Sequence, residues 1–275
     1  MTDSPYSSGL DPAAAGAPSA PPAPPVAPEA PASVPGTGTQ LIAPVWHTIV
    51  LLIIILGNSY FASVRLAHNV QNRGRILLYL GTMVWQLLLF GLVWFGLRLK
   101  KTKLRDVIGG QWSKAEDFLL DGAIAAGFWI VSAAILVGLK FAFGLASLDA
   151  KRSADQVKQT IGAITPKTLT ELAVFVLLAL CAGFFEEIVF RGYLQKQIGA
   201  ITRNAYLGLV IAAIIFGAGH GYQGTPQMVL IGLYGAMFGA LALLRRSLRP
   251  GMMAHAWQDA FSGVAAYVLT KMGML

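Results

Sequence analysis

Two adjacent carboxylates, Glu186 and Glu187, stand inside one of the most apolar stretches of the chain. From Ala173 to Phe185 no residue is charged, and Arg191 follows the second acid by four positions. Ionised side chains within a membrane span cost roughly 2.5–3.5 kcal/mol each on insertion scales, so they are rare and usually functional. On a helix, Glu187 and Arg191 have the i, i+4 spacing with the acid first, the better order for an ion pair. Glu186 points about 100° away around the helix, so we expect it to face a different neighbour.

The composition indicates an integral membrane protein. Of the 275 residues, 55% are hydrophobic and only 12% are charged, whereas soluble domains carry about 25% charged residues. The formal net charge of +8 comes from basic residues that cluster between apolar runs, which is typical of loops that face anionic lipid. No nucleic-acid-binding motif appears, so we expect the lipid bilayer as a partner and no nucleic acid.

The apolar runs predict an all-α fold, a multi-spanning transmembrane helix bundle with about seven spans. Most runs are close to the ~20 residues that cross a ~30 Å hydrocarbon core. The expected spans are residues 44–62, 76–95, 118–139, 168–197, 205–219, 227–244 and 252–269.

Three segments follow from this pattern. Residues 1–43 form a Pro/Ala-rich tail that holds ten of the 14 prolines, and we expect it to be disordered because it has too little apolar surface to bury. Residues 44–164 are expected to be N-terminal transmembrane helices. Residues 165–275 are expected to be a catalytic transmembrane core.

Basic residues between the second and third expected spans are interpreted as an ordinary basic loop, part of which has the pattern of an interfacial helix. They are Arg98, Lys100, Lys101, Lys103, Arg105 and Lys114. Counted over all seven spans, Lys and Arg favour a cytoplasmic N-terminus, whereas the residues around the first span alone favour the reverse. His47 and His68 lie near the ends of that span and are interpreted as interfacial.

Residues that carry chemistry gather after residue 180. Besides the acidic pair they are Phe216–His220, the loop Ser247–Pro250, and His255 with Asp259 at i, i+4. Each polar group in a membrane needs a hydrogen-bond partner or a water-filled cavity. These groups are therefore expected to share one site, where burying them costs the least free energy.

Residues that share a site must lie at a similar depth in the membrane. Glu186 and His220 each lie 17 residues from a turn near Arg203, so they should sit at similar depth, roughly 25 Å from the turn. His255 reaches that depth only if the hairpin around Arg203 projects past the membrane.

These groups suit hydrolysis. A glutamate hydrogen-bonded to a histidine can deprotonate water, and a second histidine with an amide or carboxylic acid can bind a developing oxyanion. The same residue types ligate zinc, with Glu186, His220, His255 and Asp259 as the candidate ligands. No HExxH helix is present, so both a metal-free site and a zinc site stay open.

The segment Glu186-Glu187-Ile-Val-Phe-Arg191-Gly-Tyr-Leu194 resembles the EExxxRxxL motif of the CAAX protease and bacteriocin-processing (CPBP, or Abi) family. Phe216 to His220 is similar to its FxxxH motif, and Ser247–Pro250 with His255 is similar to its SLxP…H stretch. The resemblance covers about residues 165 to 265. It implies a multi-spanning intramembrane endopeptidase, related to the type II CAAX prenyl endopeptidases.

By resemblance, Glu186 would activate water with His220, Glu187 and Arg191 would orient it, and His255 with the fourth residue after it would support the oxyanion. That fourth residue is commonly Asn in the family and is Asp259 here. An ionised carboxylate cannot donate to an oxyanion. Asp259 is therefore protonated by burial, or orients His255, or binds a metal.

The predicted function is hydrolysis of a peptide bond in a membrane-associated substrate, of CAAX type or another peptide, by an enzyme of the glutamate or metal-dependent type. The expected location is a bacterial inner membrane. Two alternatives are a non-catalytic scaffold or immunity protein of the same fold and a proton-coupled transporter. A transporter would more often show internal repeats, and none is visible in the sequence.

Overall fold

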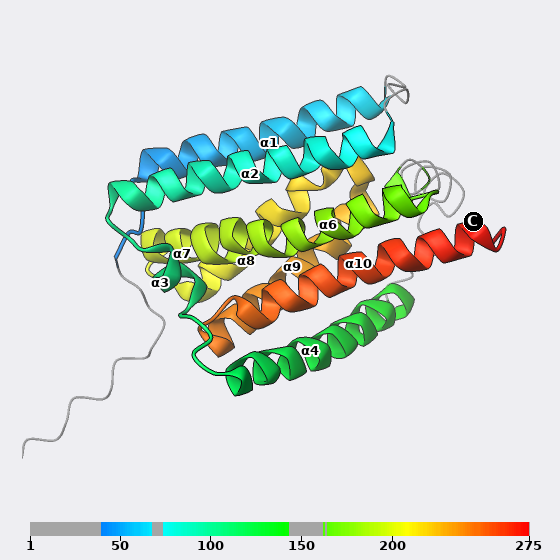
Figure 1. The fold of residues 1–275 in the computed structure, drawn as a ribbon. Helices are drawn as coiled ribbons and strands as arrows, with labels where there is room; N and C mark the ends of the chain where they lie inside the picture. The colour runs from blue at the N-terminus through cyan, green and yellow to red at the C-terminus, as the bar shows by residue number, and fades with distance from the viewer. Residues whose placement is uncertain (1–39, 68–73, 143–161, 163, 275) are drawn as a thin grey trace, which may run out of the picture. The chain divides into compact units, whose positions relative to one another are not determined.

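The computed structural model of this protein describes residues 40–67, 74–142, 162 and 164–274, and the regular structure in these ranges is helical. The all-α fold predicted from the apolar runs is confirmed (Figure 1). The predicted tail 1–43 lies almost wholly outside the described residues. At its end, however, the backbone N–H groups of Ile42 and Ala43 donate to Gln197 Oε1 at 2.9 and 3.2 Å. The folded part therefore begins slightly before the predicted boundary.

The described helices occur in the following order along the chain: α1 (Val45–Ala67), α2 (Arg75–Leu99), α3 (Leu104–Ile108), α4 (Ala115–Ala142), α6 (Leu169–Glu186), the π-helix η1 (Glu187–Gln195), α7 (Lys196–Thr202), α8 (Ala205–Gly219), the 3-10 turn η2 (Gly221–Gln223), α9 (Thr225–Arg245) and α10 (Arg249–Lys271).

In the described part of the chain, five segments are long and apolar enough to cross a membrane: Val45–Val64, Arg75–Leu99, Ala115–Leu139, Leu169–Thr202 and Thr225–Arg245. The other two expected spans are also helices, but they differ in kind. The helix α8 has only 15 residues. The helix α10 has 23 residues but carries His255, Gln258 and Asp259 within its length, which lowers its hydropathy. Of the roughly seven predicted spans, five are thus helices long and apolar enough to cross a membrane, and the other two are helices that do not meet this criterion.

Local sequence signals set several helix ends. The Thr168 hydroxyl accepts a hydrogen bond from Glu171 N–H at 3.1 Å, and the Asn204 side chain accepts from Tyr206 and Leu207 N–H, as N-cap residues do. The helices α9 and α10 each begin with a proline in the first turn, where the missing N–H costs nothing.

The helix α6 lies at the centre of the packing. It contacts α10 and α2 most extensively, and α8 pairs with α9. Figure 1 shows α1 and α2 on one side of α6, with α10 and then α4 on the other. Large apolar side chains remain exposed on the outer helices, such as Leu88, Leu119 and Ile130, which is the surface that a lipid-facing helix presents.

A buried histidine links the first helix to the π-helix. His47 is 1% exposed; its Nδ1 lies 2.7 Å from the Tyr193 hydroxyl and its Nε2 lies 2.9 Å from the Leu92 carbonyl oxygen. Because that carbonyl only accepts, Nε2 donates to it and Nδ1 accepts from Tyr193. His47, which the sequence analysis interpreted as interfacial, is therefore a buried residue that links α1 to α2 and η1, and His68 lies outside the described residues.

Candidate active site

Close backbone contact between α6 and α10 brings the acidic pair next to His255. A Cβ added at Gly183 would lie 2.7 Å from both Ala256 N and Met252 O. Only glycine leaves room for this approach. Gly183 precedes Glu186 by one helical turn, and Ala256 follows His255 directly, so this contact places the two functional stretches side by side.

The ion pair predicted from the i, i+4 spacing is present. Arg191 Nη1 lies 2.8 Å from Glu187 Oε1, and both side chains are almost fully buried. Arg191 Nη2 also donates to the Gly235 carbonyl at 3.2 Å. The guanidinium lies over the Phe216 ring at 4.2 Å and near the Phe238 ring at 5.2 Å. The charge is thus paired, hydrogen-bonded and stacked on aromatic faces.

Glu187 also orients His255. The same oxygen, Glu187 Oε1, lies 3.0 Å from His255 Nδ1. Because a carboxylate accepts, Nδ1 carries the proton and Nε2 points the other way. There it lies 3.9 Å from Glu186 Oε2 and 3.7 Å from Asp259 Oδ2. Both distances are too long for direct hydrogen bonds and suit a bridging water.

The second acid has a partner that the sequence analysis missed. Gln86 on α2 donates from Nε2 to Glu186 Oε1 at 3.0 Å and is 4% exposed. This bond leaves Glu186 Oε2 to face His255. A single amide within an otherwise apolar expected span was the signal in the sequence, because a buried amide must find a partner.

His220 lies at the end of α8, and its Nδ1 is 2.8 Å from the Phe216 carbonyl oxygen. That contact again requires Nδ1 to donate, so the neutral ring keeps its lone pair on Nε2. No hydrogen bond between Glu186 and His220 appears among the described residues. The rings of His220 and His255 both lie edge-on to the Phe216 ring, with centroid distances of 4.9 and 6.3 Å. His220 therefore lies near the same group of side chains, without the direct Glu–His bond that matched depth suggested.

Tyr222 follows His220 on η2 and is a further residue that sequence reasoning missed. Its ring stacks on the His220 ring with centroids 6.2 Å apart, and its hydroxyl accepts from Gln223 Nε2 at 3.1 Å. Burial raises the pKa of Tyr222, and the carboxylates of Glu186 and Asp259 raise it further. The phenol therefore stays protonated at neutral pH and keeps a proton to donate.

The hairpin around Arg203 is long enough to project past the membrane, as the depth of His255 requires. The helical segment Leu169–Thr202 is continuous over 34 residues, which is about 50 Å at ~1.5 Å per residue and exceeds a ~30 Å hydrocarbon core. His255, six residues into α10, can therefore lie level with the middle of this long segment.

The loop Ser247–Pro250 anchors the start of α10 to α3 and α4. Its Leu248 N–H donates to the Ile108 carbonyl at 2.8 Å. Arg249 Nε lies 3.0 Å from a carboxylate oxygen of Asp121 on α4, a residue that is 1% exposed. This part of the motif supports the helix that carries His255 and does not itself reach the acids.

The candidate metal ligands do not form a metal-binding group as they lie. Among the described residues, no three His, Cys, Asp or Glu side chains have the geometry to hold a metal ion. The nearest arrangement is His255 Nε2 with one oxygen each from Glu186 and Asp259. His220, the fourth candidate, is not hydrogen-bonded to this set.

This geometry can be set beside known proteins. Residues 168–261 match the family model described as "Type II CAAX prenyl endopeptidase Rce1-like". This segment is similar to the CAAX protease family. The match includes both acids, both histidines and Asp259, and it begins at the N-cap of α6. Searches of the curated proteins and of the solved structures found no match to the chain.

The matched segment coincides with the helices from α6 to the first half of α10. Gln86, which contacts Glu186, lies outside the matched segment, on α2. The N-terminal helices therefore contribute to the candidate active site as well as to membrane insertion.

Proposed function

We propose that this protein is an intramembrane endopeptidase that hydrolyses a peptide bond in a membrane-associated substrate. The single observation that carries the proposal is the buried network in which Glu187 holds both Arg191 and His255 and thereby turns His255 Nε2 toward Glu186. It lies in the segment that matches a protease family.

Three hydrogen-bond acceptors in this network face one another, which favours a bound water molecule between them. His255 Nε2, Glu186 Oε2 and Asp259 Oδ2 face one another at 3.7–3.9 Å, and all three are acceptors when the histidine is neutral and the acids are ionised. At least one proton must be shared among them, and a water molecule between them can donate to two. We infer that the nucleophilic water binds here.

In the proposed reaction, Glu186 removes a proton from this water, and the oxygen attacks the carbonyl carbon of the scissile peptide bond. His220 Nε2 helps to orient the water as an acceptor. The oxyanion is stabilised by His255 and by the Tyr222 hydroxyl as donors. Glu186 then transfers its proton to the departing amine, which leaves a free carboxyl end and a free amino end.

Glu187 and Arg191 act as positioning residues because neither faces the water. Asp259, which occupies a position that is commonly Asn in the family, shares the proton of His255 Nε2 in this scheme. The substrate class implied by the family is a C-terminal CAAX-type peptide at the membrane. Metal dependence is a separate hypothesis that elemental analysis tests.

The test uses the purified full chain in lipid nanodiscs. The Glu186→Gln variant keeps the hydrogen bond from Gln86 and should trap membrane peptides, which can be eluted and identified by mass spectrometry. Wild-type protein should cleave those peptides, while Glu186→Gln and His220→Ala should each reduce cleavage at least 100-fold without loss of helix content. Cleavage within threefold of wild type by either variant would contradict this mechanism, and a folded wild type that cleaves nothing trapped would favour a non-catalytic role.

A further inference from the structure

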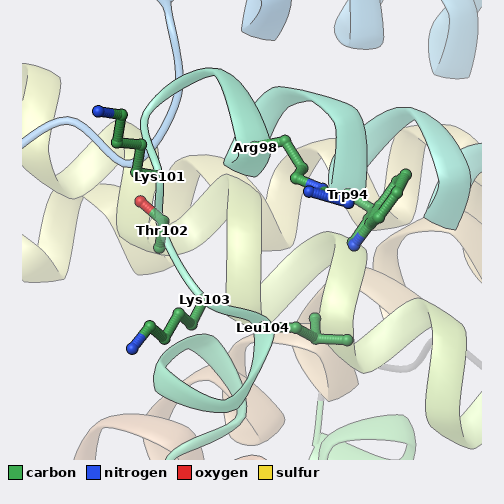
Figure 2. A pocket seen from close by; sticks show the side chains of 6 residues that line it. All are labelled: Trp94, Arg98, Lys101, Thr102, Lys103 and Leu104. Atoms are coloured by element: carbon green, nitrogen blue, oxygen red, sulfur yellow. The ribbon is translucent and has the colours of Figure 1, made fainter.

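A basic pocket at the end of α2 lies away from the acidic pair and has no part in the proposed reaction. Its volume is about 440 Å³, and it is lined by Trp94, Arg98, Lys101, Thr102, Lys103 and Leu104. Figure 2 shows Arg98 lying along Trp94, while Lys101 and Lys103 extend from the following loop. Three of the six lining residues are cationic and none is acidic.

These cations are not neutralised by neighbouring acids. Among the described residues, Arg98, Lys101 and Lys103 make no ion pair. The nearest acid in sequence, Asp106, lies 3.6 Å from Arg105. The backbone at Lys101 has a φ of +56°, an uncommon conformation for a side chain other than Gly, Asn or Asp. The chain accepts it to turn sharply between α2 and α3.

The pocket lies at the end of a segment that is long and apolar enough to cross a membrane. Two of its lining residues lie in the last turns of the apolar segment Arg75–Leu99, and the other four follow that segment. Trp94 is 45% exposed near the end of this segment, as aromatic side chains are at the membrane interface. The Arg98 guanidinium lies 4.5 Å from the centroid of the Trp94 ring, which holds its charge at the mouth of the pocket.

The loop that forms the pocket is fixed on both sides. The Thr102 hydroxyl donates to the Ile42 carbonyl at 3.2 Å. Beyond the pocket, Lys196 Nζ donates to the Val107 carbonyl at 2.7 Å. These bonds hold the backbone of the loop in place, while the side chains of Arg98, Lys101 and Lys103 are exposed to the pocket's surroundings.

We propose that this pocket binds the phosphate group of an anionic membrane phospholipid. A phosphate carries several strong acceptor oxygens, which match the guanidinium and two ammonium groups. The indole and Leu104 offer an apolar wall for the start of the acyl chains. A lipid is favoured over a free phosphate ion because the pocket is continuous with a lipid-facing helix.

Native mass spectrometry of the full chain in detergent tests this, with dioleoylphosphatidylglycerol as the probe and dioleoylphosphatidylcholine as the neutral comparison. The pocket variant is Arg98→Gln/Lys101→Asn/Lys103→Gln, in which Asn suits the positive φ. The matched control removes three exposed cations outside the pocket, Lys100→Gln/Arg203→Asn/Arg246→Asn, of which Arg203 and Arg246 also have positive φ.

A basic residue at an anionic membrane surface changes affinity roughly fivefold. We therefore expect the pocket variant to lose at least about 20-fold in affinity for phosphatidylglycerol and the control to lose less than about fivefold. The single variant Lys103→Gln should show an intermediate loss, which separates binding from misfolding. Equal losses in the two triple variants would mean a diffuse surface charge and would overturn the proposal. Displacement of the lipid by inorganic phosphate at millimolar concentration would also overturn it, in favour of a free-anion site.

Discussion

The buried pair of Glu187 and Arg191 offers the sharpest test of how the site is held together. Their N–O distance is 2.8 Å, and their side chains are 1% and 2% exposed. Removing one partner of a buried ion pair costs about 3–5 kcal/mol because the other charge stays buried and unpaired. The Arg191→Met and Glu187→Gln variants should therefore each lower the free energy of unfolding by about that amount.

The double variant should cost little more than either single change, because neither charge is then stranded. The coupling energy of the double-mutant cycle should be about 3 kcal/mol, at the upper end of values for residues in contact. Glutamine at position 187 keeps an acceptor for His255, so the cycle isolates the ion pair. The measurement is reversible unfolding in mixed detergent micelles, followed by circular dichroism.

A second ion pair in the same chain provides the control. Arg75 and Glu171 are 3.9 Å apart, and their side chains are 26% and 16% exposed. Pairs that water can reach contribute about 0–1 kcal/mol, so the same cycle at this pair should give a coupling below about 1 kcal/mol. Coupling below about 0.5 kcal/mol at Glu187 and Arg191, or equal coupling at both pairs, would refute the argument from burial.

Three further outcomes are expected. The Gln86→Leu variant should lower kcat roughly tenfold to 100-fold with little change in KM, since a hydrogen bond to a charged group contributes about 1.5–3 kcal/mol. A change confined to KM would show that Gln86 does not position Glu186. The Asp259→Asn variant should retain or raise activity if the site works without metal, whereas loss of stoichiometric zinc together with activity, seen by elemental analysis, would establish a metal site. A deletion of residues 1–40 should insert and cleave normally, while a deletion that continues through Ala43 should lower the thermal midpoint, because Ile42 and Ala43 donate to Gln197.

The local pattern of residues determined much of this protein. Long apolar runs can satisfy their backbone groups within a bilayer only as helices, so the helical fold followed from composition and spacing. The pairing of Glu187 with Arg191 followed from helical periodicity in the same way. The motifs alone also pointed to the family whose model matches residues 168–261.

The assignment of partners between helices was decided by tertiary packing. Matched depth suggested that Glu186 would pair with His220, but depth does not say how a helix is rotated about its axis. The tight contact at Gly183 instead brings His255 beside both acids, and α2 supplies Gln86. His47 looked interfacial from its position in the sequence, yet it is buried against Tyr193. Sequence spacing fixes which side chains share one helix face, whereas the rotation and close approach of separate helices depend on how all their side chains pack together.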